Sequence, residues 1–487
     1  MIDWLPVLIL STSLVPALIT FFLAQENHFW RNLINLGGAV LKLGLIVFLL
    51  IEVAGGTFHE VRFDLLPGAF LLLRVDALAL LFLTLSGLLW LLTTIYAIAY
   101  FDKKPNLSRF FGFFGLCVFS TTGIALSGSL LTFFVFYELL TLSTWPLVVH
   151  RQNPASMAAG RTYLRYAMPA SVALLVAILW LEHLTGPVEF TSGADLAGID
   201  PATLRLIFVF FVAGLGMKAA LVPLHGWLPA AMAAPAPVSA LLHAVAVVKA
   251  GAFGFVRVVH DVFGMEAITE LGLGVPLAAL ASLTIVYGSI RALGQREIKR
   301  RLAFSTVSQV SYIVLGVALA GPLGLVGGLA HLVHQGLMKI TLFFCAGIYD
   351  DRGGIRWIEQ LDGIGPRMPW TSVCFSLGAL GMIGLPPMAG FISKIYLGLG
   401  ALQSGAPWVL VVLAASTLLN AAYFLPLLYR IWFVESSTEE TLAGRPLGII
   451  APAVLTGLAA IAVGLFAGSA LSPLGWATSI VEQNYLP

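Results

Sequence analysis

Residues 214–258 read GLGMKAALVPLHGWLPAAMAAPAPVSALLHAVAVVKAGAFGFVRV. Most side chains in this stretch are apolar or small, yet it carries two lysines, two histidines and four prolines. A segment of this length and composition predicts helices that span a lipid bilayer. Proline removes a backbone donor and clashes with the preceding turn, so Pro223 and Pro229 predict a break in the first of these helices.

The rest of the chain has the same character. Of its 487 residues, 59% are hydrophobic and only 10% are charged, which excludes a water-soluble globular class. Long apolar runs recur from end to end, and the alternation typical of a membrane barrel is absent. A net charge of +2 gives no reason to expect nucleic-acid binding. We therefore expect one all-α polytopic membrane domain whose surroundings are the lipid bilayer.

Apolar runs separated by turn and charge clusters predict about 14 transmembrane spans. The expected spans are 3–23, 33–53, 76–100, 110–127, 129–149, 161–184, 203–235, 237–259, 272–293, 302–320, 323–348, 370–402, 406–433 and 447–468.

Two spans, 203–235 and 370–402, are longer than a bilayer requires and contain interior prolines. We expect both to be broken helices, and broken helices at matching positions of two halves are typical of an ion-binding site. The halves would be two five-helix repeats, inverted relative to one another because five is an odd number. The expected division is 1–109 for helices 1 to 3, 110–260 for the first repeat, 261–435 for the second, and 436–487 for helix 14 and the tail.

Most of the 26 Lys and Arg residues fall in loops on one side of this arrangement, notably at 102–109, 150–161 and 291–301. The positive-inside rule then predicts that these loops are cytoplasmic and that both termini face outward. The expected location is the inner membrane of a prokaryotic cell.

Enzyme motifs are missing from the sequence. The three cysteines lie in apolar spans without metal-type spacing, and no nucleotide loop or hydrolase motif is present. We expect no bound cofactor, no metal and no bond-making chemistry in this chain, while its membership of a redox-driven complex stays open.

Ionisable residues inside the apolar spans are the candidate functional groups, because each charged one costs roughly 2.5–3.5 kcal/mol to insert at mid-bilayer. Glu138 and Lys218 have opposite signs and lie in separate spans, so we expect them to offset each other's insertion cost. The other candidates are His225, His243, Lys249, His331, His334, Lys339 and Lys394.

Structural readings compete with the functional one at three positions. Lys42 is expected to extend to the headgroup region. Lys394 would also serve as a partner for carbonyl groups released by the break at Pro386 and Pro387. For His225 a proton-carrying role and a purely structural role stay open.

The spacing in the span at 323–348 suits a proton relay. At 100° per residue, His331, His334 and Lys339 share an arc of about 140° and rise roughly 12 Å along the helix. A neutral imidazole both accepts and donates a proton, and a buried lysine responds to a nearby carboxylate. Alternating lysine, histidine and glutamate with water between them predicts a proton path.

Four segments carry a resemblance to a known family. They are LLTFFVFYELLTLSTWPLV at 130–148, the stretch 214–258, REIKRRLAFSTVSQVSYIVLG at 296–316 and GLPPMAGFISKIYL at 384–397. Together they resemble the antiporter-like membrane subunits of respiratory complex I, membrane-bound hydrogenases and Mrp-type cation/proton antiporters. The resemblance implies two inverted five-helix repeats with half-open proton paths joined by charged residues at mid-membrane.

The same resemblance assigns roles to single residues. Glu138 resembles the family's key glutamate and Lys218 its partner lysine, while Lys249 resembles the connecting lysine, with His243 on the route to it. Lys394 resembles the residue that serves the exit path.

Lys299 in REIKRR matches a family lysine, although its place in a basic loop is explained equally well by topology. The carboxylate that some members place in span 6 is missing here. The second histidine of span 11 stands one position early, at His334, with Gln335 in the usual place.

The leading hypothesis is a proton-translocating subunit of a multisubunit Mrp-type antiporter, similar in size to the D subunit. The alternatives are a proton-pumping subunit of an NADH–quinone oxidoreductase or hydrogenase, similar to its M and N subunits, and a membrane subunit that energises a cytoplasmic partner for inorganic-carbon uptake. The expected partners are other membrane subunits and protons. Sodium as the coupled ion, and the direction of transport, are left open.

Overall fold

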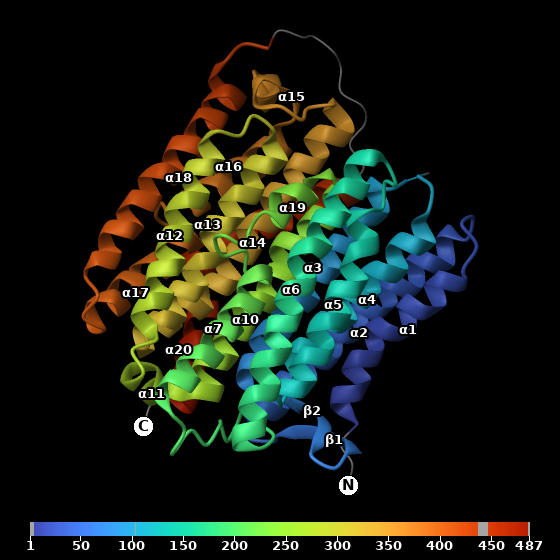
Figure 1. Ribbon diagram of the computed structural model, residues 1–487. Helices are drawn as coiled ribbons and strands as arrows, with labels where there is room; N and C mark the ends of the chain where they lie inside the picture. Colours follow the sequence, from blue (N-terminus) through green and yellow to red (C-terminus); the bar gives the residue numbers. More distant parts are fainter. Residues whose placement is uncertain (1–3, 103, 437–446, 486–487) are drawn as a thin grey trace. The chain divides into compact units, whose positions relative to one another are not determined.

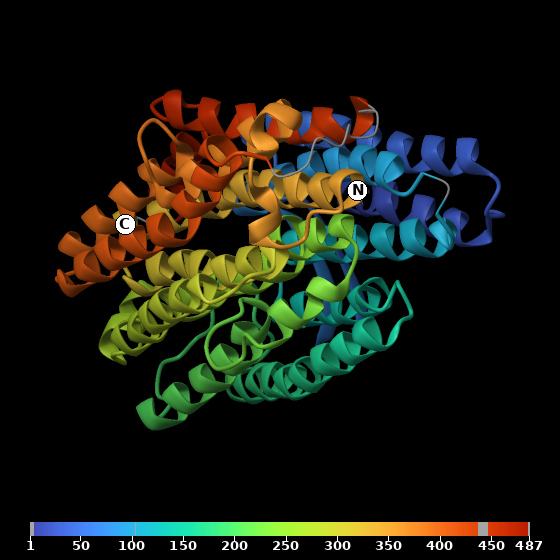
Figure 2. The same cartoon turned by 90° about the horizontal axis from the view of Figure 1, so that it is seen from above.

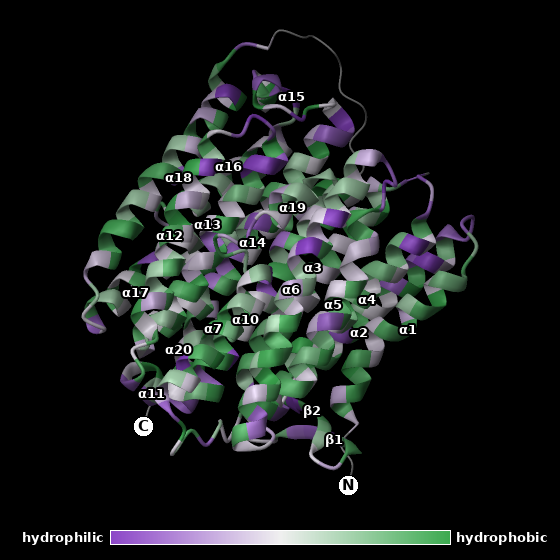
Figure 3. Ribbon diagram, viewed as in Figure 1, coloured by the Kyte–Doolittle hydropathy of each residue, from purple (hydrophilic) through white to green (hydrophobic). Residues whose placement is uncertain are grey.

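The computed structural model describes residues 4–102, 104–436 and 447–485. Within these ranges 13 helices are long and apolar enough to cross a membrane. Figure 3 shows hydrophobic residues along the helices and hydrophilic residues gathered at helix ends and in loops, as around α15 (Ile364–Arg367). The prediction of an all-α polytopic membrane protein is confirmed, while the inverted repeats and their boundaries stay predictions.

The first of two compact units is built from Met1–Thr94, Phe101–Ala219 and Val245–Leu273 (Figure 1). Its elements are α1 (Leu5–Phe22), α2 (His28–Ala54), β1 (His59–Leu66), β2 (Ala69–Val75), most of α3 (Ala77–Tyr100), α4 (Leu107–Leu126), α5 (Leu130–Val148), α6 (Pro154–Thr185), α7 (Pro201–Lys218), α10 (Val247–Val256), the π-helical η3 (Arg257–Phe263) and α11 (Gly264–Glu270).

The second unit is built from Ile95–Tyr100, Ala220–Ala244 and Gly274–Pro487. Figures 1 and 2 show its α17 and α18 side by side. Its elements are the end of α3, α8 (Trp227–Ala230), η1 (Ala231–Ala233), α9 (Ala236–Ala240), the π-helical η2 (Leu241–Val245), α12 (Gly274–Leu293), α13 (Ile298–Ala318), α14 (Pro322–Gly353), η4 (Ile358–Leu361), α15, α16 (Pro369–Ile383), α17 (Ala389–Gln403), α18 (Trp408–Phe433), α19 (Leu447–Leu465) and α20 (Pro473–Asn484).

Local capping decides where the site-bearing helices begin. The Asn153 side chain accepts the backbone N–H of Ser156 at 2.8 Å, and Pro154 stands at the first helical position. This cap explains why α6 begins seven residues before the expected start at 161. Asp200 caps α7 in the same way through the backbone N–H of Thr203.

Both predicted helix breaks are present. The helix α7 ends at Lys218, Ala220 adopts a φ of +57°, and helical structure resumes only at Trp227. The helix α16 ends at Ile383, Gly384 adopts a φ of +89°, and α17 begins at Ala389. The second break divides the expected span 370–402 into the two short helices α16 and α17. This pair and the 13 candidate spans of the described residues account for the predicted count of about 14.

The prediction of one continuous helix over 237–259 is wrong. The structure shows α9, η2, a kink at Ala246 and then α10 and η3. Each π-helical segment widens the turn by one residue, a local rearrangement that hydropathy does not register and that occurs frequently at functional sites.

Five further elements have no counterpart in the expected spans. They are the two-stranded antiparallel sheet of β1 and β2, the helices α11 and α15, the short η4 and the terminal α20. All five are shorter than a span, so a scan for bilayer-length apolar runs passes over them.

Candidate functional site

Glu138 lies on α5, which begins behind the cap of Ser129 on the backbone N–H of Thr132. Its carboxylate accepts a hydrogen bond from the Ser171 hydroxyl of α6 at 2.7 Å, and the side chain is half-buried. The helix α6 lacks the carboxylate that some family members place there, and it provides a hydroxyl donor to Glu138 instead.

Lys218 is the last residue of α7 and only 1% exposed. Its ammonium group donates to the backbone carbonyl of Tyr137 and lies 3.2 Å from the centre of the Tyr137 ring. A helix C-terminus and an aromatic face both favour a cation. Among the described residues no ion pair joins Lys218 to Glu138, and Lys218 contacts Tyr137, the residue next to the glutamate. That the two charges offset each other's insertion cost stays a prediction.

Close packing brings α10 to the end of α7. A Cβ atom on Gly251 would lie 2.8 Å from the carbonyl carbon of Lys218, so only glycine permits this approach. Lys249 lies two residues earlier on α10 and is fully buried. The first unit therefore collects Glu138, Lys218 and Lys249 on neighbouring helices.

Three further candidates lie in the second unit. The ring of His225, in the segment after the first break, makes an edge contact with Tyr287 at 5.0 Å. His243, in η2, stacks on Phe343 of α14 with ring centres 4.4 Å apart. Lys299 is 8% exposed, and its ammonium group donates to the carbonyl of Ala234 at 2.7 Å. A lysine that served only to set the membrane topology would lie in solvent and would not donate to a buried carbonyl.

The helix α14 is continuous, so the arc expected for its three ionisable residues is present, and all three are fully buried. His331 Nδ1 lies 2.8 Å from the Ser393 hydroxyl of α17, and its ring is 5.1 Å from that of Tyr312. Lys339 donates to the Ser305 hydroxyl at 2.7 Å and to the Leu302 carbonyl at 3.2 Å.

The displaced histidine is not distinguished from its neighbour by burial. His334 and Gln335 are both fully buried in α14.

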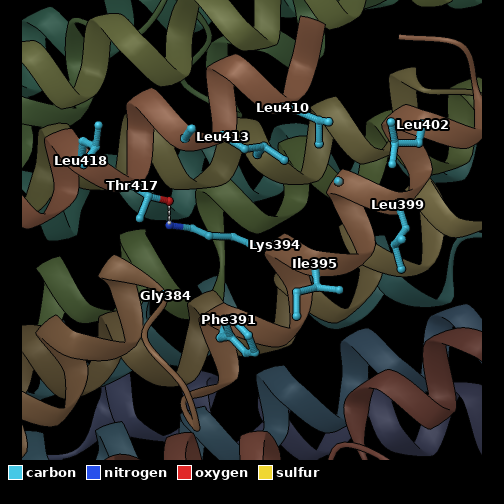
Figure 4. Close-up of a pocket in the computed structure, with 12 residues that line it drawn as sticks. Gly384, Phe391, Lys394, Ile395, Leu399, Leu402, Leu410, Leu413, Thr417 and Leu418 are labelled. Carbon is cyan, nitrogen blue, oxygen red and sulfur yellow. Dashed lines mark hydrogen bonds between the residues drawn. The ribbon is translucent and has the colours of Figure 1, made fainter. Parts of the chain in front are cut away.

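Lys394 of α17 lies at the second break. Figure 4 shows its ammonium group beside Thr417 of α18, to which it donates at 3.1 Å, and it also donates to the Ile383 carbonyl at 2.7 Å. The contact with Ile383 is the one expected if Lys394 served as a partner for carbonyl groups that the helix break leaves without a helical donor. The lysine also lines a groove of about 660 Å³ whose other lining residues are mostly apolar.

Lys42 requires a correction. The structure buries it completely, with its ammonium group donating to Thr122 of α4 and lying 5.3 Å from the centre of the Trp90 ring. It does not extend to a headgroup region because α3 and α4 cover it.

Sequence reasoning missed the neutral partners of these charges. Asn420 is the one amide in the expected span 406–433 and was a usable signal. The hydroxyl residues gave none, because serine and threonine are common in membrane helices and often bond to their own backbone. The missed partners are Tyr137, Ser171, Ser305, Tyr312, Ser393, Thr417, Asn420 and Tyr423.

In the ranges that the structure describes, no group of three or more His, Cys, Asp or Glu side chains is placed to hold a metal ion.

Comparison with known proteins identifies the family. Residues 127–420 match the family described as NADH:quinone oxidoreductase/Mrp antiporter, transmembrane. The chain belongs to this family. Within it, the chain is 35% identical over 416 residues to NADH-quinone oxidoreductase subunit N of Desulforudis audaxviator, covering 81% of this chain and 82% of the relative.

Two solved structures share the antiporter-family fold over nearly the whole chain. The Mrp complex from Dietzia sp. DQ12-45-1b contains a chain with a TM-score of 0.83, 25% identity and 97% coverage of both chains. An archaeal respiratory complex, the membrane-bound sulfane sulfur reductase, contains one with a TM-score of 0.88, 25% identity and 99% coverage of both. Several other curated relatives are longer proteins, of which this chain spans 50%, 34% and 42%.

Proposed function

We propose that this chain is the proton-translocating, antiporter-like subunit of a multisubunit membrane complex. The observation that supports the proposal most directly is how its buried lysines are held. Lys218 and Lys339 donate to a carbonyl, an aromatic ring or a hydroxyl, and no carboxylate within the described residues pairs with them. A lysine with neutral acceptors retains or releases its proton according to its surroundings, whereas a fixed counter-charge would hold it protonated.

The proposed path uses the residues expected from the sequence. In the first unit Glu138 and Lys218 receive the proton and Lys249 passes it on. In the second unit the remaining groups carry it toward Lys394 at the second break. They are His225, His243, Lys299, His331, His334 and Lys339.

The host complex is part of the proposal. Our sequence-based preference is an Mrp-type cation/proton antiporter with sodium as a candidate coupled ion, basic loops in the cytoplasm and both termini outside. A redox host is the second candidate, because the chain matches most of the length of an NADH-quinone oxidoreductase subunit and resembles a chain of a respiratory reductase complex.

Glu138→Gln tests the proposed path. The purified native complex is reconstituted into liposomes that enclose a pH-sensitive dye, and internal pH is followed after a sodium gradient, or NADH with a quinone, is applied. We expect Glu138→Gln to lower the rate of proton movement at least roughly tenfold, because the amide cannot carry the proton.

Glu182→Gln is the matched control for this experiment. Glu182 lies near the end of α6 and accepts the backbone N–H of Val188 at 3.2 Å, so its replacement should leave the rate within about twofold. Equal rates in the wild-type complex and the Glu138→Gln complex would overturn the path.

A further inference from the structure

A chain of hydroxyl and amide groups continues from Lys339. The Ser305 hydroxyl that receives the Lys339 ammonium lies 2.8 Å from the hydroxyl of Tyr423 on α18. The Tyr423 hydroxyl lies 2.7 Å from Oδ1 of Asn420, one turn earlier on the same helix. Tyr423 and Asn420 are both fully buried, so water does not compete for these bonds from outside the protein.

Counting protons shows that this chain has two arrangements. The Tyr423 hydroxyl has one proton and lies within bonding distance of two oxygens, and Oδ1 of Asn420 only accepts. When Lys339 is an ammonium it donates to Ser305, so Ser305 donates to Tyr423 and Tyr423 donates to Asn420. When Lys339 is a neutral amine it can accept from Ser305. Tyr423 then donates to Ser305 and no longer to Asn420, whose Oδ1 keeps only the longer bond from the Ser289 hydroxyl at 3.4 Å among the bonds of the described residues.

The far end of the chain is the second helix break. Asn420 Nδ2 donates to the carbonyl of Met382 at 3.1 Å, in the last turn of α16. The next carbonyl, that of Ile383, accepts the ammonium group of Lys394. The state of Asn420 therefore bears on the carbonyl next to the one that holds Lys394.

We propose that Ser305, Tyr423 and Asn420 form a reversible hydrogen-bond chain that transmits the charge state of Lys339 to the α16 break and so positions Lys394. The inference rests on the proposed function and adds three positioning residues to it. No covalent bond changes: one proton leaves or joins Lys339, and two hydroxyl groups reverse their direction. The chain makes the release of a proton at Lys394 depend on whether Lys339 already carries one.

Other ionisable groups on the packed elements are His243 of η2, which stacks on Phe343, and Lys299 and Arg301 of α13. Arg301 is held by the Tyr423 carbonyl at 3.0 Å, and Lys299 by the carbonyl of Ala234. Among the bonds of the described residues, Lys339 is the charged group that donates to the first hydroxyl of the chain, so His243 serves as the alternative trigger in the test.

Infrared difference spectra of the purified complex, recorded between acidic and alkaline pH, report tyrosine hydroxyl bonding without requiring transport. We expect a change in the tyrosine C–O band that disappears in Tyr423→Phe and in Lys339→Met. It should remain in Tyr349→Phe, a control whose buried hydroxyl lies 3.0 Å from the Ser372 hydroxyl. Ser305→Ala, which leaves Tyr423 in place, should also abolish it.

Persistence of the band change in Tyr423→Phe or Lys339→Met would overturn the inference, as would its loss in His243→Asn with retention in Lys339→Met. The transport assay supplies the second readout: Asn420→Leu should slow proton movement roughly tenfold, and Ser305→Thr, which keeps the hydroxyl, should restore most of what Ser305→Ala loses. A band change in a complex that moves no protons would refute the proposed function alone, and transport without the band change would refute the inference alone.

Discussion

At the scale of single residues, the structure shows buried lysines bound to neutral acceptors. Lys218 donates to the Tyr137 carbonyl in the middle of α5, and Lys394 donates to the Ile383 carbonyl at the end of α16. Lys339 donates to a carbonyl and a hydroxyl. Hydrogen bonds to charged groups contribute about 1.5–3 kcal/mol each, enough to offset part of the insertion cost without fixing the charge. Small changes in these acceptors should therefore alter transport more than folding.

Ser171→Ala removes the one hydroxyl that, in the part of the chain that the structure describes, donates to Glu138. We expect a three- to tenfold slower proton movement, since about 1 kcal/mol of carboxylate stabilisation is lost, with little change in thermal stability. Ser120→Ala is the matched control, because the Ser120 hydroxyl donates to the Leu116 carbonyl of its own helix. If both alanine variants slowed transport equally, the Ser171 contact would have no special role.

His150 makes stability depend on pH. It lies in the loop between α5 and α6, and burial, followed by the charges of Arg109 and Arg151, lowers its pKa from 6.5 to about 4. Between these pH values the unfolded chain binds more protons, so the free energy of unfolding falls as pH falls from about 6.5 to 4, by up to about 3 kcal/mol.

His150→Gln should remove most of that dependence. Melting temperatures in detergent at pH 7.5 and pH 5 measure it, with His183→Gln at an exposed position as the control. An unchanged acid sensitivity in His150→Gln would show that other groups cause it.

At the scale of elements, the two broken helices are the features that organise the site. Each break ends a helix whose last carbonyls or last lysine belong to a candidate path. Residues at such breaks are held by close backbone approaches, which leave little room for added atoms.

Gly384→Ala tests the second break. Gly384 has a φ of +89°, and a Cβ atom there would lie 2.9 Å from Cδ and 3.1 Å from Nζ of Lys394. The substitution costs about 1 kcal/mol or more in backbone strain and displaces the ammonium group from Ile383. We expect roughly tenfold slower proton movement in the liposome assay.

Gly405→Ala separates strain from displacement. Gly405 also has a positive φ, of +68°, but no atom lies within 4 Å of the added Cβ. It should lose similar stability and keep its transport rate. Equal loss of transport in both variants would mean that strain alone explains the effect at Gly384.

The sequence predicted the membrane fold, most spans and both breaks, because apolar length and proline act locally. It placed Glu138 and Lys218 correctly in α5 and at the end of α7. It did not predict that Lys218 would contact Tyr137, that Lys42 would be covered, or that η2 and η3 would interrupt a span. These features depend on which helices pack together, and residues far apart in the sequence decide that.

At the scale of the whole molecule, the antiporter-family fold is compatible with more than one host complex, so the choice of host is tested by what co-purifies with the chain. The Mrp-type proposal predicts that the tagged chain, purified with its partners in mild detergent, shows no flavin or iron–sulfur absorbance and responds to a sodium gradient. Co-purified flavin or iron–sulfur clusters would instead favour the redox host. A zinc-containing soluble partner would favour the inorganic-carbon alternative.

The central claim is that specific buried lysines, rather than buried lysines in general, move protons. Lys218 and Lys42 are both buried in the first unit, each with a neutral acceptor and an aromatic ring, but only Lys218 lies on the proposed path. The most direct measurement is proton movement by reconstituted complexes that carry Lys218→Met or Lys42→Met. We predict at least a tenfold loss for Lys218→Met and a rate within about twofold of wild type for Lys42→Met; full activity in Lys218→Met, or equal losses in both, would contradict the account.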